Sequence, residues 1–282
     1  MKRINTLKLL YFFFCLSFGY SFAQTNYRFV YELTFKLNSK KDSLVKENYL
    51  LDVYPKESKS KFYSFNYYRN DSLMNAYHTK SEREGGVNID IGNLPEVKYP
   101  LAVSISDGKT EFYETFNGDA YKVVEEKKPV WKISSETKQI KNWKSQKATT
   151  EFGGRKWTAW FSNEFPIAEG PYKFKNLPGL VTEIADETGS FKFSLEGVSK
   201  ITEEFFPFIY KDAIPVSKEK LAKALNNYYL DPGAKLREGI LVDDGGTVFH
   251  INGGFSKKFI DERTEEARKK LKNFDNKIEI SQ

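Results

Sequence analysis

Apolar and polar residues alternate along several stretches of this chain, as they do in strands that bury one face. From Tyr27 to Leu37, six successive odd positions are aromatic or aliphatic, and most even positions between them are polar. A period of two recurs, with few exceptions, at 49–53, 101–105, 157–161 and 190–196. Side chains of a strand point alternately to its two faces, so these stretches predict a mainly β protein.

Glycine and asparagine mark the tight turns between these stretches. Asn117-Gly118 and Gly153-Gly154 each suit a two-residue hairpin turn, in which both central residues have positive φ. Helical patterns are fewer. Residues 66–84 suggest a short helix or an ordered loop, whereas Ser217 is a suitable N-cap for a helix that reaches Tyr229. Residues 262–274 predict a charged helix with a narrow apolar stripe.

The spacing of these elements predicts the fold class. About ten short strands with a few covering helices favour one curved antiparallel sheet, or half-barrel, over the alternative of a β-sandwich. No internal repeat and no Pro/Ser-rich linker divides the chain. We therefore expect one β-rich domain over residues 24–282, after a separate segment at residues 1–23.

That first segment has the three parts of a secretory signal peptide. It combines three early basic residues, an apolar run from Leu9 to Phe18 and the small-x-small site Ser21-Phe22-Ala23. The alternative is an uncleaved anchor, although the apolar run is short for a bilayer span. We expect export to the periplasm, the outer membrane or the extracellular space, with no transmembrane segment in the mature chain.

Composition narrows the function classes. The only cysteine, Cys15, lies in the signal segment, so the expected mature chain has no disulfide or thiolate chemistry. Of 44 basic residues three lie in that segment, which leaves 41 against 38 acidic residues. This small, scattered excess does not favour nucleic-acid binding. We expect no cofactor and no metal.

Catalytic patterns are weak. The two histidines, His78 and His250, lack the spacing of a zinc site. His250 follows Asp243 and Asp244, and a hydrolase that uses these three residues is one alternative. The same Asp-Asp-Gly-Gly run is also an ordinary turn between strands. Because no Gly-x-Ser-x-Gly elbow and no phosphate loop is present, a non-enzymatic protein is favoured.

Aromatic residues suggest a binding surface. Trp157 and Trp160 lie three positions apart on one predicted strand, so they point to opposite faces. One of them could face the concave side and bind an apolar chain or a peptide. Trp131, Tyr172 and Phe174 could extend that surface. Alternatively, other elements cover both faces and both indoles are structural.

One further motif links the chain to a family. Its residues are Asn176, Leu177, Pro178, Gly179, Leu180 and Val181, and Gly170-Pro171 precedes them. Pro-Gly at the centre suits a type II turn with positive φ at the glycine, and Asn176 suits a left-handed backbone. Here the chain resembles the GLPGLI family of Bacteroidetes envelope proteins, from whose motif it departs at Asn176 and Val181.

The resemblance implies a compartment, the cell envelope, and no established reaction. We therefore expect an exported, non-enzymatic protein that binds an apolar, lipid or peptide segment, or that serves an outer-membrane transport protein or another envelope protein. A purely structural or interaction protein with no small ligand is the remaining alternative.

Overall fold

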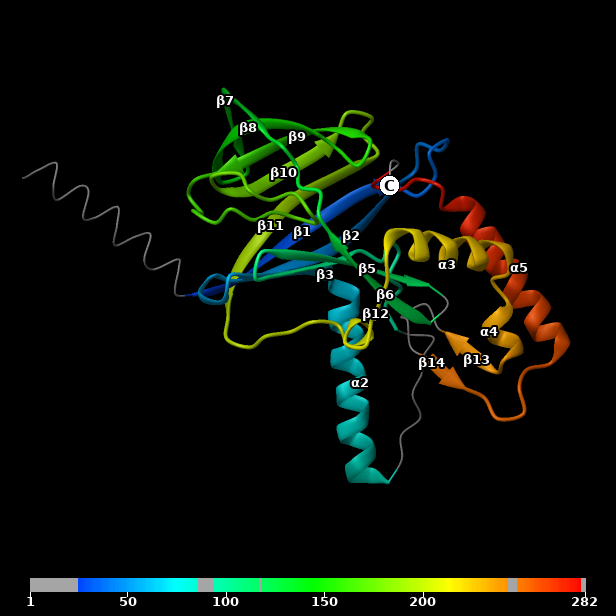
Figure 1. Ribbon diagram of the computed structural model, residues 1–282. Helices are drawn as coiled ribbons and strands as arrows, with labels where there is room; N and C mark the ends of the chain where they lie inside the picture. The colour runs from blue at the N-terminus through cyan, green and yellow to red at the C-terminus, as the bar shows by residue number, and fades with distance from the viewer. Residues whose placement is uncertain (1–24, 86–93, 117, 243–247, 280–282) are drawn as a thin grey trace, which may run out of the picture.

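A large, curved β-sheet is the framework of the molecule (Figure 1). The computed structural model describes residues 25–85, 94–116, 118–242 and 248–279. Within these residues the sheet has twelve strands and does not close into a barrel. The predicted mainly β, curved-sheet architecture with a few helices is confirmed, with twelve strands where about ten were expected.

The twelve strands lie in the order β12-β6-β5-β4-β3-β2-β1-β11-β10-β9-β8-β7, and every neighbouring pair is antiparallel except β12 and β6. In chain order they are β1 (Asn26–Lys36), β2 (Leu44–Tyr54), β3 (Lys59–Ser64), β4 (Ala102–Ser106), β5 (Lys109–Phe116), β6 (Asp119–Glu125), β7 (Lys132–Ile140), β8 (Trp143–Phe152), β9 (Arg155–Ser162), β10 (Leu180–Asp186), β11 (Phe191–Ile201) and β12 (Ile214–Pro215).

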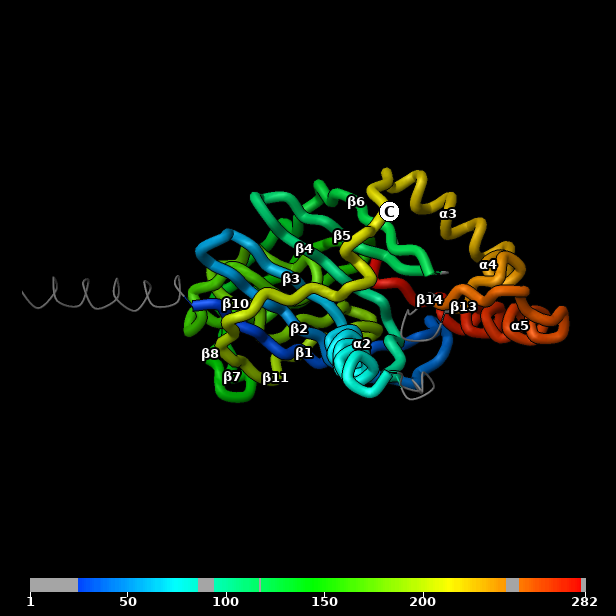
Figure 2. The backbone as a smooth tube through the Cα atoms, turned by 90° about the horizontal axis from the view of Figure 1, so that it is seen from below, coloured from blue at the N-terminus to red at the C-terminus, as the bar shows by residue number. Residues whose placement is uncertain are grey.

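The remaining elements lie outside this sheet. A separate hairpin is formed by β13 (Ile240–Val242) and β14 (Val248–His250). The helices are α2 (Phe65–Glu84), α3 (Lys218–Leu230), α4 (Ala234–Arg237) and α5 (Lys257–Asn273), with short 3-10 turns η1 (Pro55–Glu57) and η3 (Phe208–Tyr210). Figure 2 shows α3, α4, α5 and the small hairpin gathered beyond one end of the sheet.

Strand β1 is the centre of the sheet and behaves as its pattern predicts. It pairs with β2 on one side and β11 on the other. Its odd residues from Tyr27 to Phe35 are buried in the main hydrophobic core, while its even residues are only partly buried. This core covers the inner face of the sheet, because it joins side chains from both halves, such as Phe62 of β3 and Phe193 of β11.

Two segments outside the strands complete the inner core. The connection between β9 and β10, residues 163–179, folds back over the inner face and buries Phe174 and Leu177 almost completely. The segment after α5 adds Ile278, whose N–H donates to the Tyr99 hydroxyl over 2.8 Å. The curved sheet is therefore filled by its own chain.

A second core lies on the outer face of β2 to β6. Tyr63 and Tyr113 of the sheet contact the segment that contains Tyr210, and the first turns of α2 add Tyr67. Beyond these turns α2 projects from the body, as Figure 1 shows. Only Tyr67 and Asn70 of its twenty residues are buried.

The predicted turns and caps can be compared with the structure. Gly153 and Gly154 have φ values of 60° and 78°, as a tight hairpin requires. The hydroxyl of Ser217 caps α3, as predicted. Residues 66–84 are not a short helix or loop but part of the long helix α2. Its apolar periodicity is weak because most of the helix has no face to bury.

Candidate functional site

The two tryptophans of β9 point to opposite faces of the sheet, as predicted. Trp157 is 2% exposed and packs in the inner core. Trp160 is 7% exposed and lies on the other face, where the Lys138 and Lys147 ammonium groups stand 4.2 and 5.9 Å from its ring. Neither indole faces an open concavity.

The other aromatics proposed for this surface are enclosed as well. Tyr172 and Phe174 are at most 3% exposed, and the Phe174 ring lies 4.5 Å from that of Trp157. Trp131 is half-buried and donates its indole N–H to the Lys175 carbonyl over 2.8 Å. The prediction of an open concave surface is wrong, because residues 163–179 fill the space that a ligand would need.

The Asn176–Val181 motif contributes buried side chains to the core on the inner face. Asn176 has the predicted positive φ, 71°. Gly179 does not, so the predicted type II turn is wrong. Position 179 requires glycine for a steric reason, because a Cβ there would lie 2.3 Å from the Ser162 carbonyl oxygen. Leu177, Leu180 and Val181 are buried, whereas Pro178 is exposed.

Gly170-Pro171 has the same architectural character. A Cβ at Gly170 would lie 2.1 Å from the Phe174 carbonyl oxygen and 2.7 Å from the Val181 side chain. The Pro171 carbonyl accepts a 3.1 Å hydrogen bond from the Phe174 N–H. Both glycines of the motif region allow the 163–179 segment to lie close against strands.

The residues of the hydrolase alternative are not brought together in the described part of the chain. His250 is exposed on β14. Asp243 and Asp244 lie outside the described residues. His78 is exposed on α2, with its Nδ1 3.5 Å from Glu82. Among the residues that the structure describes, no group of three His, Cys, Asp or Glu side chains could hold a metal ion.

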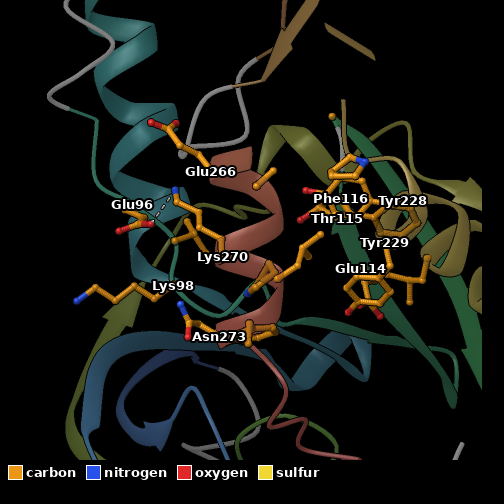
Figure 3. Close-up of a pocket in the computed structure, with 18 of the residues that line it drawn as sticks. Glu96, Lys98, Glu114, Thr115, Phe116, Tyr228, Tyr229, Glu266, Lys270 and Asn273 are labelled. Atoms are coloured by element: carbon orange, nitrogen blue, oxygen red, sulfur yellow. Dashed lines mark ion pairs between the residues drawn. The ribbon is translucent and has the colours of Figure 1, made fainter. Parts of the chain in front are cut away.

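A different site stands out at the end of the sheet. A cavity of about 690 Å³ lies between the β5–β6 end, the loop 96–100 and helices α3, α4 and α5 (Figure 3). Most of its lining side chains are aliphatic or aromatic, among them Phe116, Leu225, Tyr228, Leu236, Leu271 and Phe274. Such a concave apolar space is the form of site that small apolar ligands occupy.

One wall is a row of rings from β5 and α3. Phe116 of β5 stacks on Tyr228 of α3 at 5.6 Å, and also on Tyr121 of β6, which is not a lining residue, at 4.8 Å. Tyr229 continues the row 6.3 Å further on. Helix α3 can place Tyr228 there because Leu221 and Leu225, on the same side, are buried against Val123 of β6.

The opposite wall is formed by α5 and the loop that precedes β4. The carboxylate of Glu47 on β2 accepts hydrogen bonds from the N–H groups of Lys98 and Tyr99, over 2.8 and 3.2 Å, and from the Ser64 hydroxyl. Burial outweighs these bonds and raises the pKa of Glu47 to about 7. This buried carboxyl therefore fixes the wall loop to the sheet.

One carboxylate faces the cavity from the sheet. Glu114 of β5 lines the space and is half-buried, and its carboxylate makes no hydrogen bond with the described residues. Burial raises its pKa, and the positive charges of Lys277 and Lys173 oppose that shift.

A buried ionic cluster lies on the same face of the β5–β6 pair. The Lys173 ammonium is 2.8 Å from Glu125 and 2.6 Å from Glu279, and Lys218 is 2.9 Å from Glu125. Although burial opposes it, the hydrogen bonds from Lys173 and Lys218 lower the pKa of Glu125 to about 2. Tyr172 donates its hydroxyl hydrogen to Glu279. These charges satisfy one another and tie the 163–179 segment to the last described residues.

The cavity was not predicted from the sequence, although two of its walls carried a signal. Leu225 and Tyr228 lie on the helix predicted to reach Tyr229, and Ala267, Leu271 and Phe274 lie on the apolar stripe predicted for residues 262–274. In the structure these side chains line the cavity. Two apolar helix faces can pack together or leave a cavity between them. Which of these occurs depends on where the helices dock, and no local sequence pattern encodes that.

No family model matches the chain, and no curated protein is significantly similar to it. Among solved structures, PNGF-II is similar over 71% of this chain, with 14% identity and a TM-score of 0.46. The chain spans about a third of the length of PNGF-II, 32%.

Two further solved structures have lower scores. An uncharacterized conserved protein from Thermus thermophilus is similar over 70% of this chain and 93% of its own, with 8% identity and a TM-score of 0.35. A LolA superfamily protein from Nitrosomonas europaea is similar over 64% of this chain and 88% of its own, with 6% identity and a TM-score of 0.27. At these scores the likenesses carry no argument about function.

Among the described residues, no helix combines the length and the apolar character that crossing a bilayer requires.

Proposed function

We propose that this protein is an exported, non-enzymatic cell-envelope protein that binds an apolar chain in the cavity between β5, α3 and α5. The observation that carries the proposal is the cavity itself, about 690 Å³ with mostly apolar walls. Small-molecule sites typically measure roughly 300–1,000 Å³ and are lined by apolar side chains with a few polar groups. The cavity volume lies in this range, and most of its lining side chains are apolar, with charged side chains such as Glu114 among the rest.

The compartment is proposed from the sequence. Residues 1–23, which lie outside the described residues, have the pattern of a secretory signal, and the Asn176–Val181 motif resembles an envelope family. Cell fractionation and amino-terminal sequencing test this part. Recovery of a mature chain that begins at Gln24 outside the cytoplasm supports export, and a full-length cytoplasmic chain contradicts it.

Binding can be tested with N-phenyl-1-naphthylamine, a neutral dye whose fluorescence rises in apolar surroundings. Ala267 of α5 lines the cavity and is only partly buried, so Ala267→Trp fills the space without removing a core side chain. We expect this change to weaken dye binding by about tenfold or more, because the indole occupies volume that the dye needs.

The matched control is Ala222→Trp, which adds the same side chain at an exposed position of α3 outside the cavity lining. It should bind the dye as the unmodified protein does, and both variants should keep the same thermal midpoint. Equal weakening by both variants, or saturable binding that Ala267→Trp leaves intact, would contradict a site in this cavity.

A further inference from the structure

The charges at the cavity edge are not balanced. Among the residues that the structure describes, four basic and three acidic side chains line it, Lys98, Arg263, Lys269 and Lys270 against Glu96, Glu114 and Glu266. Two pairs neutralise each other, since Lys270 is 3.6 Å from Glu96 and Arg263 is 3.0 Å from Glu266. Lys98, Lys269 and Glu114 remain, and neither lysine forms an ion pair with a described acidic residue.

The unpaired cations belong to a larger basic region. The last seven residues of α5 include Arg268, Lys269, Lys270 and Lys272 and no acidic residue. Lys41 joins them from the β1–β2 connection, where its ammonium donates to the Asn273 side chain over 3.3 Å. A helix carboxyl end by itself favours cations. Because Lys41 and Lys98 come from other elements, the preference of a helix end for cations does not explain the whole region.

The apolar and the basic side chains line the same cavity from different sides of α5. Figure 3 shows Glu96, Lys98, Lys270 and Asn273 together on one side of α5, while Phe116 and Tyr228 lie on the other. Because Lys98, Lys269 and Asn273 line the same cavity as these rings, a ligand that fills the cavity contacts both groups. Lysine ammonium groups and the Asn273 amide all donate hydrogen bonds, which suits an anionic head group.

We propose that the ligand is a single-chain amphiphile with an anionic head, such as a long-chain carboxylate. Its chain lies in the cavity and its head lies at Lys98, Lys269 and Asn273. This inference rests on the proposed function and adds the chemistry of the head group. Because the two lysines are exposed, the carboxylate keeps part of its hydration and gains a moderate, salt-sensitive attraction.

The test compares oleate with oleyl alcohol, which has the same chain and a neutral head, by calorimetric titration below the micelle concentration. We expect the carboxylate to bind roughly three- to tenfold more tightly at low salt. The difference should shrink in about 0.5 M NaCl, because salt screens exposed charges. Lys98→Gln/Lys269→Gln should lower the affinity for oleate to that for the alcohol and so remove the preference.

The control is Lys257→Gln/Lys258→Gln, which removes two exposed charges from the other end of α5. It should keep the preference for oleate. Equal affinity for both ligands in the unmodified protein, or a preference that survives Lys98→Gln/Lys269→Gln, would overturn the head-group assignment while the cavity proposal stands. If neither ligand binds, the proposed function itself fails.

A membrane surface is the other source of anionic head groups. Sedimentation with phosphatidylglycerol vesicles separates the two cases. Little co-sedimentation, together with oleate binding, supports the assignment. Strong co-sedimentation that depends on Lys98 and Lys269, without binding of dissolved oleate, overturns it.

Discussion

At the scale of single residues, close approach decides where the 163–179 segment needs glycine. Gly179 lies against the Ser162 carbonyl and Gly170 against the Phe174 carbonyl, with no room for a Cβ at either position. The sequence indicated a turn through Pro-Gly, but turn chemistry describes only local φ preferences. Gly179 is required by its contact with Ser162, at the end of β9. That contact depends on the tertiary fold, so a local sequence pattern could not show it.

Gly179→Ala should therefore be strongly destabilising. A Cβ would lie 2.3 Å from the Ser162 carbonyl oxygen and 2.9 Å from the Asn163 side chain, so the backbone has to move. We expect a loss of about 1–3 kcal/mol in the free energy of unfolding, measured by urea denaturation. Gly197→Ala is the control, because nothing lies within 4 Å of its position, and it should change stability by less than about 0.5 kcal/mol. Equal effects of the two changes would refute the contact argument.

At the scale of elements, the site depends on parts that pack against the sheet without joining it. The loop before β4 is held by Glu47, and the end of the described chain is held by Arg155, which donates to the Asn276 side chain and the Lys277 carbonyl. Strands with a clear alternation, such as β1, were predicted because they bury one face, whereas β7 buries only Ile140. Helix α2 was expected to be shorter, because its exposed faces leave a weak apolar pattern.

The Glu47 anchor predicts a pH dependence. Its pKa is about 7 in the folded protein against an ordinary 4.5, so the folded state holds the proton more tightly. The stabilising contribution of this group is complete below about pH 4.5 and is lost as the pH rises through about 7. Relative to Glu47→Gln, the unmodified protein should lose up to about 3 kcal/mol of stability between these limits.

Urea denaturation at pH 5 and pH 8 measures this difference. The control is Glu126→Gln, at an exposed position next to the end of β6, which should follow the pH dependence of the unmodified protein. Parallel pH dependences of Glu47→Gln and the unmodified protein would show that the Glu47 carboxyl does not carry the effect.

At the scale of the whole molecule, the curved sheet holds its own chain rather than a ligand. Residues 163–179 and the segment after α5 fill the inner face, where the sequence had suggested a binding surface around Trp157. The fold class followed from alternation and turns. The site did not, because it forms where helices from the last third of the chain meet the end of the β5–β6 pair.

The most direct test of the cavity is photocrosslinking with a long-chain alcohol that carries a diazirine on its alkyl chain. Adducts on the purified protein would be mapped by peptide mass spectrometry, with unlabelled oleyl alcohol as the competitor. Binding in the cavity predicts competed adducts within residues 225–230 and 267–274. Competed adducts confined to residues 157–174, or none that the competitor removes, would contradict the account.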